Sequence, residues 1–181
     1  GEYIRALPVG EFIDRSRPWL TDSAPWPAER YRPDVFEAMA PLVQERVSTL
    51  GEVPGYVDFL FVEELTFDEK AWNKVMVNAA EHAAVMLDAA IAAYEDPSTP
   101  WEADPLVAVL GELGEANEVP KKQRQAAVRL ATTGRSVGPP LGESLVLLGR
   151  DEVLARLRAA RELVGREVPG GGGADGEPDQ G

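Results

Sequence analysis

The chain has 181 residues, a formal net charge of −13 and a hydrophobic share of 44%. This length is enough for one ordinary domain or two small helical ones. Cysteine is absent and His82 is the single histidine, which excludes disulfides and thiolate or multi-histidine zinc sites. No apolar run reaches membrane-spanning length and no signal-peptide pattern is present. We therefore predict a cytoplasmic protein with neither a membrane nor DNA as partner.

The first hundred residues predict helices joined by a proline-rich connection. A short amphipathic stretch over 9–15 precedes residues 17–33, whose prolines and two tryptophans argue against a regular helix. From Pro33, apolar residues recur at helical spacing as far as Leu50, and Pro41 is expected to bend or split this helix. The longest helical signal then runs from about Asp68 to Tyr94.

Residues 96–100 end that signal and predict a boundary between two helical subdomains, 33–100 and 101–164. The second subdomain is expected to hold four helices, over 104–115, 120–132, 139–148 and 151–164. Asp151 is the expected N-cap of the last helix, and glycines 134, 149 and 165 are expected helix stops. Residues 165–181 predict a disordered tail because they are rich in glycine and acid. The predicted fold class is all-α, with two consecutive helical bundles.

A basic window stands out against the acidic whole. No acidic residue occurs between positions 119 and 142, and the window contains Lys121, Lys122, Arg124, Arg129 and Arg135. The spacing predicts that Lys121, Lys122 and Arg129 share one face of a helix. Arg135 would lie in the following loop, and Gly138–Pro139 would lead into the next helix, with its free amide groups pointing back. Such a local patch on an anionic protein suits phosphates or unstacked bases.

These residues also have purely structural explanations, which the pattern leaves open. The window could be solvated charge, with Arg129 complementing the C-terminal end of its own helix. Arg46 borders the apolar stripe of residues 35–50 and could pair with a nearby acid. His82 has no second ligand nearby and is expected to be packed or half-exposed. We predict no catalytic residue and no metal site.

The common catalytic motifs are missing, which disfavours a stand-alone enzyme. The sequence contains no Walker-type phosphate loop, no dinucleotide fingerprint, no Gly-x-Ser-x-Gly elbow and no His-Glu-x-x-His pair. Two interpretations stay open: a region that binds RNA, and an acidic helical module that binds other proteins.

Several segments resemble a known family. They are residues 1–8 (GEYIRALP), 41–50 (PLVQERVSTL), 127–148 (AVRLATTGRSVGPPLGESLVLL) and 147–157 (LLGRDEVLARL). In order, from residue 1 to about 164, they are similar to the C-terminal, anticodon-binding half of bacterial glutamate–tRNA ligase. The segments TGRSVGPPL and LLGRDEVLARL are closest in style to actinobacterial members.

The resemblance implies the recognition half of a ligase that attaches glutamate to tRNA. Residues 1–32 would be the end of the stem-contact segment and its connection. ATP and Mg²⁺ would serve a catalytic domain outside this chain, the partner would be a glutamate-accepting tRNA, and the whole enzyme would be a monomer. By position, Arg46, Arg129, Arg135, Gly138 and Pro139 are expected to bind the anticodon. A second set is expected to position phosphates: Lys121, Lys122 and Arg124.

Two positions depart from the family pattern. Ala127 stands where a proline is common, which should loosen one turn. Gly142 stands where an aromatic residue is common. The missing aromatic side chain should leave space in the core, which costs about 2–4 kcal/mol of stability unless neighbouring side chains fill that space.

Overall fold

The computed structural model describes residues 2–164, and these form an all-α structure without a β-strand. The predicted fold class is thereby confirmed for this part of the chain, whereas the predicted tail at 165–181 and the helix stop at Gly165 lie outside it. In chain order the helices are α1 (Glu2–Ala6), α2 (Val9–Thr21), α3 (Pro33–Gln44), α4 (Val53–Val57), α5 (Glu69–Trp72), α6 (Ala80–Glu95), α7 (Ala103–Ala116), α8 (Ala126–Thr133), α9 (Leu141–Leu148) and α10 (Arg150–Leu163). Short turns complete the order: η1 (Ala28–Arg30), η2 (Leu50–Glu52), η3 (Asp58–Leu60), the π-helical η4 (Asn73–Val77) and η5 (Lys121–Gln123).

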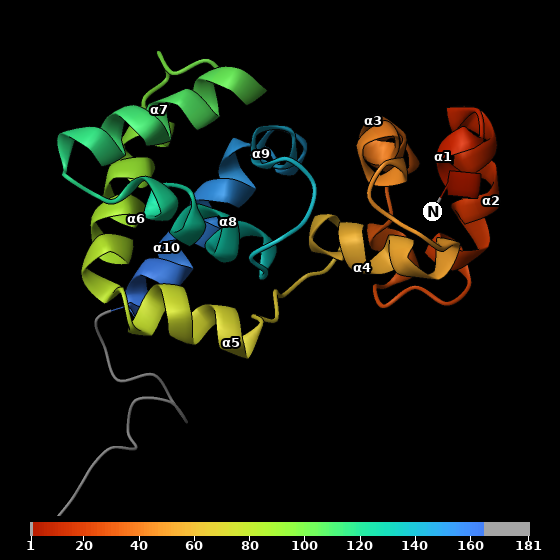
Figure 1. Cartoon of the computed structure of the whole chain (residues 1–181), viewed down its shortest axis with the longest axis horizontal. Helices are drawn as coiled ribbons and strands as arrows, with labels where there is room; N and C mark the ends of the chain where they lie inside the picture. The colour runs from red at the N-terminus through yellow and green to blue at the C-terminus, as the bar shows by residue number, and fades with distance from the viewer. Residues whose placement is uncertain (1, 165–181) are drawn as a thin grey trace, which may run out of the picture.

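The molecule consists of two helical bodies, each with its own hydrophobic core (Figure 1). The first body contains α1 to α4, and its buried apolar side chains run from Ile4 to Phe61. The second body contains α5 to α10, with a core that runs from Ala71 to Val164. An extended segment between Phe61 and Asp68 joins them, and Leu148 of α9 packs against both cores.

The division between these cores lies near residue 65, whereas the sequence pattern placed a subdomain boundary at residue 100. The turn after α6 is bound tightly to the helices that follow it. The Tyr94 hydroxyl donates to the Leu106 carbonyl at 2.7 Å. The Arg150 guanidinium lies over the Trp101 ring at 5.0 Å and donates to the Tyr94 carbonyl at 2.7 Å. The proline-containing turn therefore bends the chain within one core.

Two prolines lie inside helices that the sequence pattern expected them to interrupt. Helix α2 continues through Pro18 to Thr21, and α3 runs unbroken past Pro41. A proline inside a helix removes one hydrogen bond and costs about 3 kcal/mol. Burial of one helical face outweighs that cost, because Phe12 and Leu20 of α2 and Phe36 and Met39 of α3 are almost completely buried.

The long helical signal over 68–94 is broken in the structure. Asp68 caps α5 through its carboxylate, which accepts from the Ala71 amide at 2.9 Å. The π-helical η4 closes with a bond from the Asn78 amide to the Asn73 carbonyl at 2.8 Å, and α6 leaves at an angle of 87° to the preceding helix. Within residues 2–164 no single helix is long and apolar enough to span a membrane, although this bent pair together passes the same criteria of length and composition.

The basic window folds differently from its predicted single helix. Residues 121–123 form the 3-10 turn η5, and α8 begins only at Ala126, so Lys121, Lys122 and Arg129 do not share one helical face. Helix α9 begins at Leu141 instead of Pro139, and Gly149 caps α10 where Asp151 was expected. The predicted stops are correct at Gly134 and Gly149, which adopt φ values of 82° and 88°.

Gly142 does not leave a hole in the core, contrary to the expectation from the family pattern. Helices α7 and α9 approach each other so closely here that a Cβ at Gly142 would lie 2.5 Å from the Ala103 carbonyl oxygen. The backbone of α7 occupies the space of a side chain. The other departure, Ala127, is buried in the first turn of α8.

We expect Gly142→Ala to lower the free energy of unfolding by about 1–3 kcal/mol, because the new methyl group forces two helix backbones apart. Gly111→Ala is the matched control, since Gly111 lies within α7 and a Cβ there would meet no atom within 4 Å. This control should stabilise the protein by roughly 0.5–1 kcal/mol. Urea unfolding of both variants measures the difference, and equal effects would contradict the proposed close approach.

Candidate nucleic-acid interface

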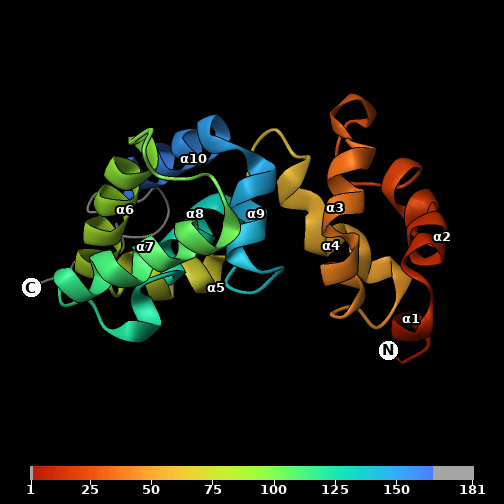
Figure 2. The same cartoon turned by 90° about the horizontal axis from the view of Figure 1, so that it is seen from above.

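The loop between α8 and α9, residues 134–140, lies beside the first body (Figure 2). We call it the 134–140 loop. It begins at Gly134, whose left-handed conformation ends α8 and whose amide donates to the Leu130 carbonyl at 2.9 Å. The Gly134 carbonyl accepts from the Asp68 amide at 2.8 Å. A Cβ at Gly134 would collide with the Thr66 carbonyl oxygen, so only glycine permits this contact with the connecting segment.

Arg129 of α8 supports the far end of the loop. Its Nη1 donates to the Pro139 carbonyl at 2.9 Å, and its side chain is partly buried. Burial lowers the pKa of Arg129 below its ordinary value, and the nearby charge of Arg46 lowers the pKa further. The two arginines are therefore close enough to repel each other, which makes this a place where an anion is favoured.

Arg46 reaches the same loop from the first body. It follows α3, is exposed, and its Nη1 donates to the Gly138 carbonyl at 3.2 Å. Two arginines that are 83 positions apart thus bind neighbouring carbonyls of one loop. Among the ion pairs of residues 2–164, neither arginine has a carboxylate partner. Arg46 therefore does not form the ion pair with a nearby acid that was the structural alternative for it within residues 2–164.

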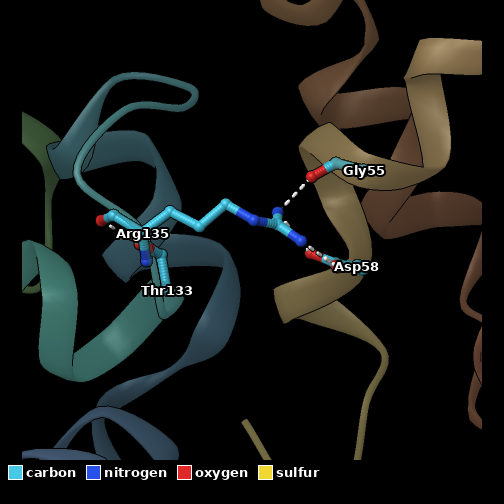
Figure 3. Close-up of polar contacts among 4 residues, drawn as sticks. All are labelled: Gly55, Asp58, Thr133 and Arg135. Carbon is cyan, nitrogen blue, oxygen red and sulfur yellow. Dashed lines mark hydrogen bonds and ion pairs between the residues drawn. The ribbon is translucent and has the colours of Figure 1, made fainter. Parts of the chain in front are cut away.

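Arg135, whose expected anticodon role stays a prediction, extends from the loop toward the first body. Figure 3 shows its guanidinium pointing across the gap to the first body. The two terminal nitrogens donate to the Asp58 carboxylate at 2.9 and 2.6 Å, and Nη1 also donates to the Gly55 carbonyl. Arg135 therefore links the two bodies and is occupied by protein groups. Asp58 was missed by the sequence reasoning, although it is an isolated acid in an apolar run over 56–62.

The remaining basic residues of the window divide into two kinds. Arg124 donates from Nε to the Val119 carbonyl at 2.9 Å, and its aliphatic stem covers Gly114 of α7. It holds the turn before η5 and is only partly exposed. Lys121 and Lys122 are exposed, so their ammonium groups are available for phosphates.

Two further features of the loop bear on RNA binding. Val137 at the loop tip has 79% of its surface exposed, the highest value among the exposed large hydrophobic residues of the described chain, and it offers a contact for an unstacked base. Pro139 is buried and Gly138 is partly exposed. Within the described residues, no group of three or more His, Asp or Glu side chains is arranged to hold a metal ion.

The comparisons with known proteins agree with this geometry. The model of the anticodon binding domain family matches residues 11–161, so the chain belongs to this family. The glutamate–tRNA ligase of Thermobifida fusca is 51% identical over 163 residues, which cover 90% of this chain and 34% of the relative. That of Salinispora arenicola is 47% identical over 167 residues, covering 89% of this chain and 34% of the relative. The resemblance drawn from the sequence is confirmed.

Solved structures show the same fold. A glutamate tRNA ligase from Elizabethkingia meningosepticum, crystallised in complex with its amino acid, superimposes with a TM-score of 0.70 over 90% of this chain and 31% of the other. Its sequence identity of 19% means that the likeness concerns the fold alone. The chain spans about a third of the length of the curated relatives that it matches.

The link between Arg135 and Asp58 can be measured by a double-mutant cycle on the free energy of unfolding. We expect Arg135→Ala and Asp58→Ala to show a coupling of about 1 kcal/mol or more, because the pair is bidentate and Asp58 is only 19% exposed. The control is Arg17 with Asp14, which are 56% and 70% exposed, and its coupling should stay below about 0.5 kcal/mol. A coupling no larger than that of the control would show that the link contributes nothing to the arrangement of the bodies.

Proposed function

We propose that this chain recognises the anticodon of a glutamate-accepting tRNA, as one part of a glutamate–tRNA ligase. One observation carries the proposal: Arg46 and Arg129 come from separate bodies and converge on the carbonyls of Gly138 and Pro139. Lys122 lines a cavity together with Ser136 of the same 134–140 loop, so one lysine also lies near it. The names of the relatives support glutamate as the amino acid.

The arrangement suits a single-stranded RNA loop more than a regular double helix. Proteins read RNA loops by splaying out the bases, stacking them on arginine planes or apolar groups, and contacting their polar edges. Arg46 is exposed and uses Nη1 for the loop carbonyl, so the rest of its guanidinium plane can face a base. Arg129 is more buried and keeps the loop backbone in place beneath that base.

The net charge of the chain favours binding to RNA through local contacts and disfavours long-range attraction. A protein with a net charge of −13 repels a polyanion at a distance. Lys121 and Lys122 provide positive charge in a stretch of chain without acids, and they are the candidates for phosphate contacts. Binding should therefore depend on a few groups and fall as salt concentration rises.

The chemical reaction of the whole enzyme is also part of the proposal, and we assign it to a region outside this chain. We propose that ATP and Mg²⁺ activate glutamate in a part of the enzyme outside these 181 residues. The monomeric state of that enzyme and its cytoplasmic location stay predictions.

The alternative is an acidic helical module that binds another protein. A titration of a fluorescently labelled glutamate tRNA with the 181-residue chain at two salt concentrations separates the two functions. Anticodon recognition predicts saturable binding whose affinity falls linearly with salt on logarithmic axes, by a slope of about 0.7 for each neutralised phosphate of a single strand. Absence of binding at low salt would favour the protein-interaction module.

Arg46→Ala is expected to weaken binding of the cognate tRNA by roughly 1–3 kcal/mol and to reduce discrimination against tRNAs with other anticodons. Arg46→Gln keeps a donor for the Gly138 carbonyl but loses the guanidinium plane, so it should also lose discrimination. Arg17→Ala is the control, because it removes the same charge from an exposed ion pair on α2. If Arg46→Ala weakens cognate and non-cognate tRNAs equally, Arg46 does not read a base.

A further inference from the structure

A cavity of about 380 Å³ opens on the second body beside the 134–140 loop. Its walls come from four places in the chain: the bend between η4 and α6, the face of α6, the η5–α8 turn and Ser136 of the loop. The 87° bend at residues 78–79 creates the cavity, because it turns η4 away from the start of α6. This volume lies within the range of roughly 300–1,000 Å³ that is typical of small-molecule sites.

The polar rim of the cavity is basic. Lys74 comes from η4, His82 from α6 and Lys122 from η5, and none of the described residues that line the cavity is acidic. Both lysines are exposed, and neither takes part in an ion pair among those of residues 2–164. On a chain with 31 acidic and 18 basic residues, two lysines around one opening favour an anion.

The floor of the cavity is apolar. It consists of small and branched side chains: Val75, Ala79, Ala83, Ala126 and Ala127. A phosphate alone would leave this surface uncovered, whereas a nucleobase would cover it. The combination of an apolar floor with a cationic rim matches the two ends of a nucleotide.

Gln123 supplies a polar group at the wall. Within the described residues, its Oε1 atom is buried and has no hydrogen-bond partner. An unsatisfied buried polar atom costs about 1–3 kcal/mol, so a partner is favoured. If the amide turns toward the cavity, an N–H on the edge of a base supplies that partner.

The cavity reaches the 134–140 loop at Ser136. Ser136 lines it and lies two residues before Gly138, whose carbonyl binds Arg46. A neighbouring hollow, which shares His82 and Gln123 with the cavity, is also lined by Glu81, which repels phosphate. The RNA chain is therefore expected to enter from the side of Lys74, Lys122 and Ser136.

We propose that this cavity binds one unpaired nucleotide of the same RNA loop, in addition to the bases at Arg46 and Arg129. The base lies on the alanine and valine floor beside Gln123, and its phosphate contacts Lys74 and Lys122. This inference rests on the proposed function, because the nucleotide is delivered by the RNA that the 134–140 loop holds.

The test combines a double variant with single abasic substitutions in the RNA. Affinities are measured for the 181-residue chain and for Lys74→Ala/Lys122→Ala against a labelled anticodon hairpin, with each loop position made abasic in turn. We expect the double variant to bind about tenfold more weakly and its salt slope to fall by about 0.7, the value for one lost phosphate contact. At one loop position the abasic change should weaken the wild-type chain but have little further effect on the double variant.

Lys70→Ala is the matched control, because Lys70 is exposed on α5, four residues before Lys74, and does not line the cavity. Thermal unfolding of each variant verifies that the fold is kept. If every abasic change affects wild type and the Lys74→Ala/Lys122→Ala variant equally, the cavity does not hold a loop nucleotide. If free uridine monophosphate saturates the wild-type cavity without such coupling, the source of the nucleotide is not the RNA loop. If the wild-type chain does not bind the hairpin at all, the result contradicts the proposed function itself, and not only the inference about the cavity.

Discussion

Attachment of the 134–140 loop to both hydrophobic cores is the constraint on which the proposed RNA-binding face depends. Arg129 holds the loop from its own body, Arg46 holds it from the first body, and Arg135 extends from it to Asp58. The connecting segment over 62–68 has few buried side chains, so it cannot by itself fix the angle between the bodies. Leu148, at the C-terminal end of α9, adds an apolar contact to both cores.

This attachment has an electrostatic consequence. Three arginines that serve the loop use carbonyl oxygens as partners, and only Arg135 also meets a carboxylate among the ion pairs of residues 2–164. Carbonyl dipoles orient a guanidinium without neutralising its charge, so Arg46 and Arg129 keep their positive charge beside the loop.

Much of the fold could be predicted from local pattern, and the exceptions have physical causes. Glycines 134 and 149 end helices as expected, because a positive φ is a local property that glycine favours. The π-helical bend after Trp72 and the passage of α2 through Pro18 were not predicted, since burial of one face outweighed the local preference. The close approach at Gly142 was also missed, because it depends on the backbone of α7, some forty residues earlier.

The sequence by itself determined the all-α class, the basic window and the resemblance to glutamate–tRNA ligases, because composition, helical spacing and motif letters are written along the chain. It also indicated Arg46 and Arg129 as candidates, through that resemblance. Only the tertiary structure decided that these two meet at one loop, that Arg135 bridges to Asp58, and that Lys74 and His82 share a cavity with Lys122. Such meetings depend on how two cores pack and where a helix bends, and long-range packing of this kind leaves no local pattern in a single sequence.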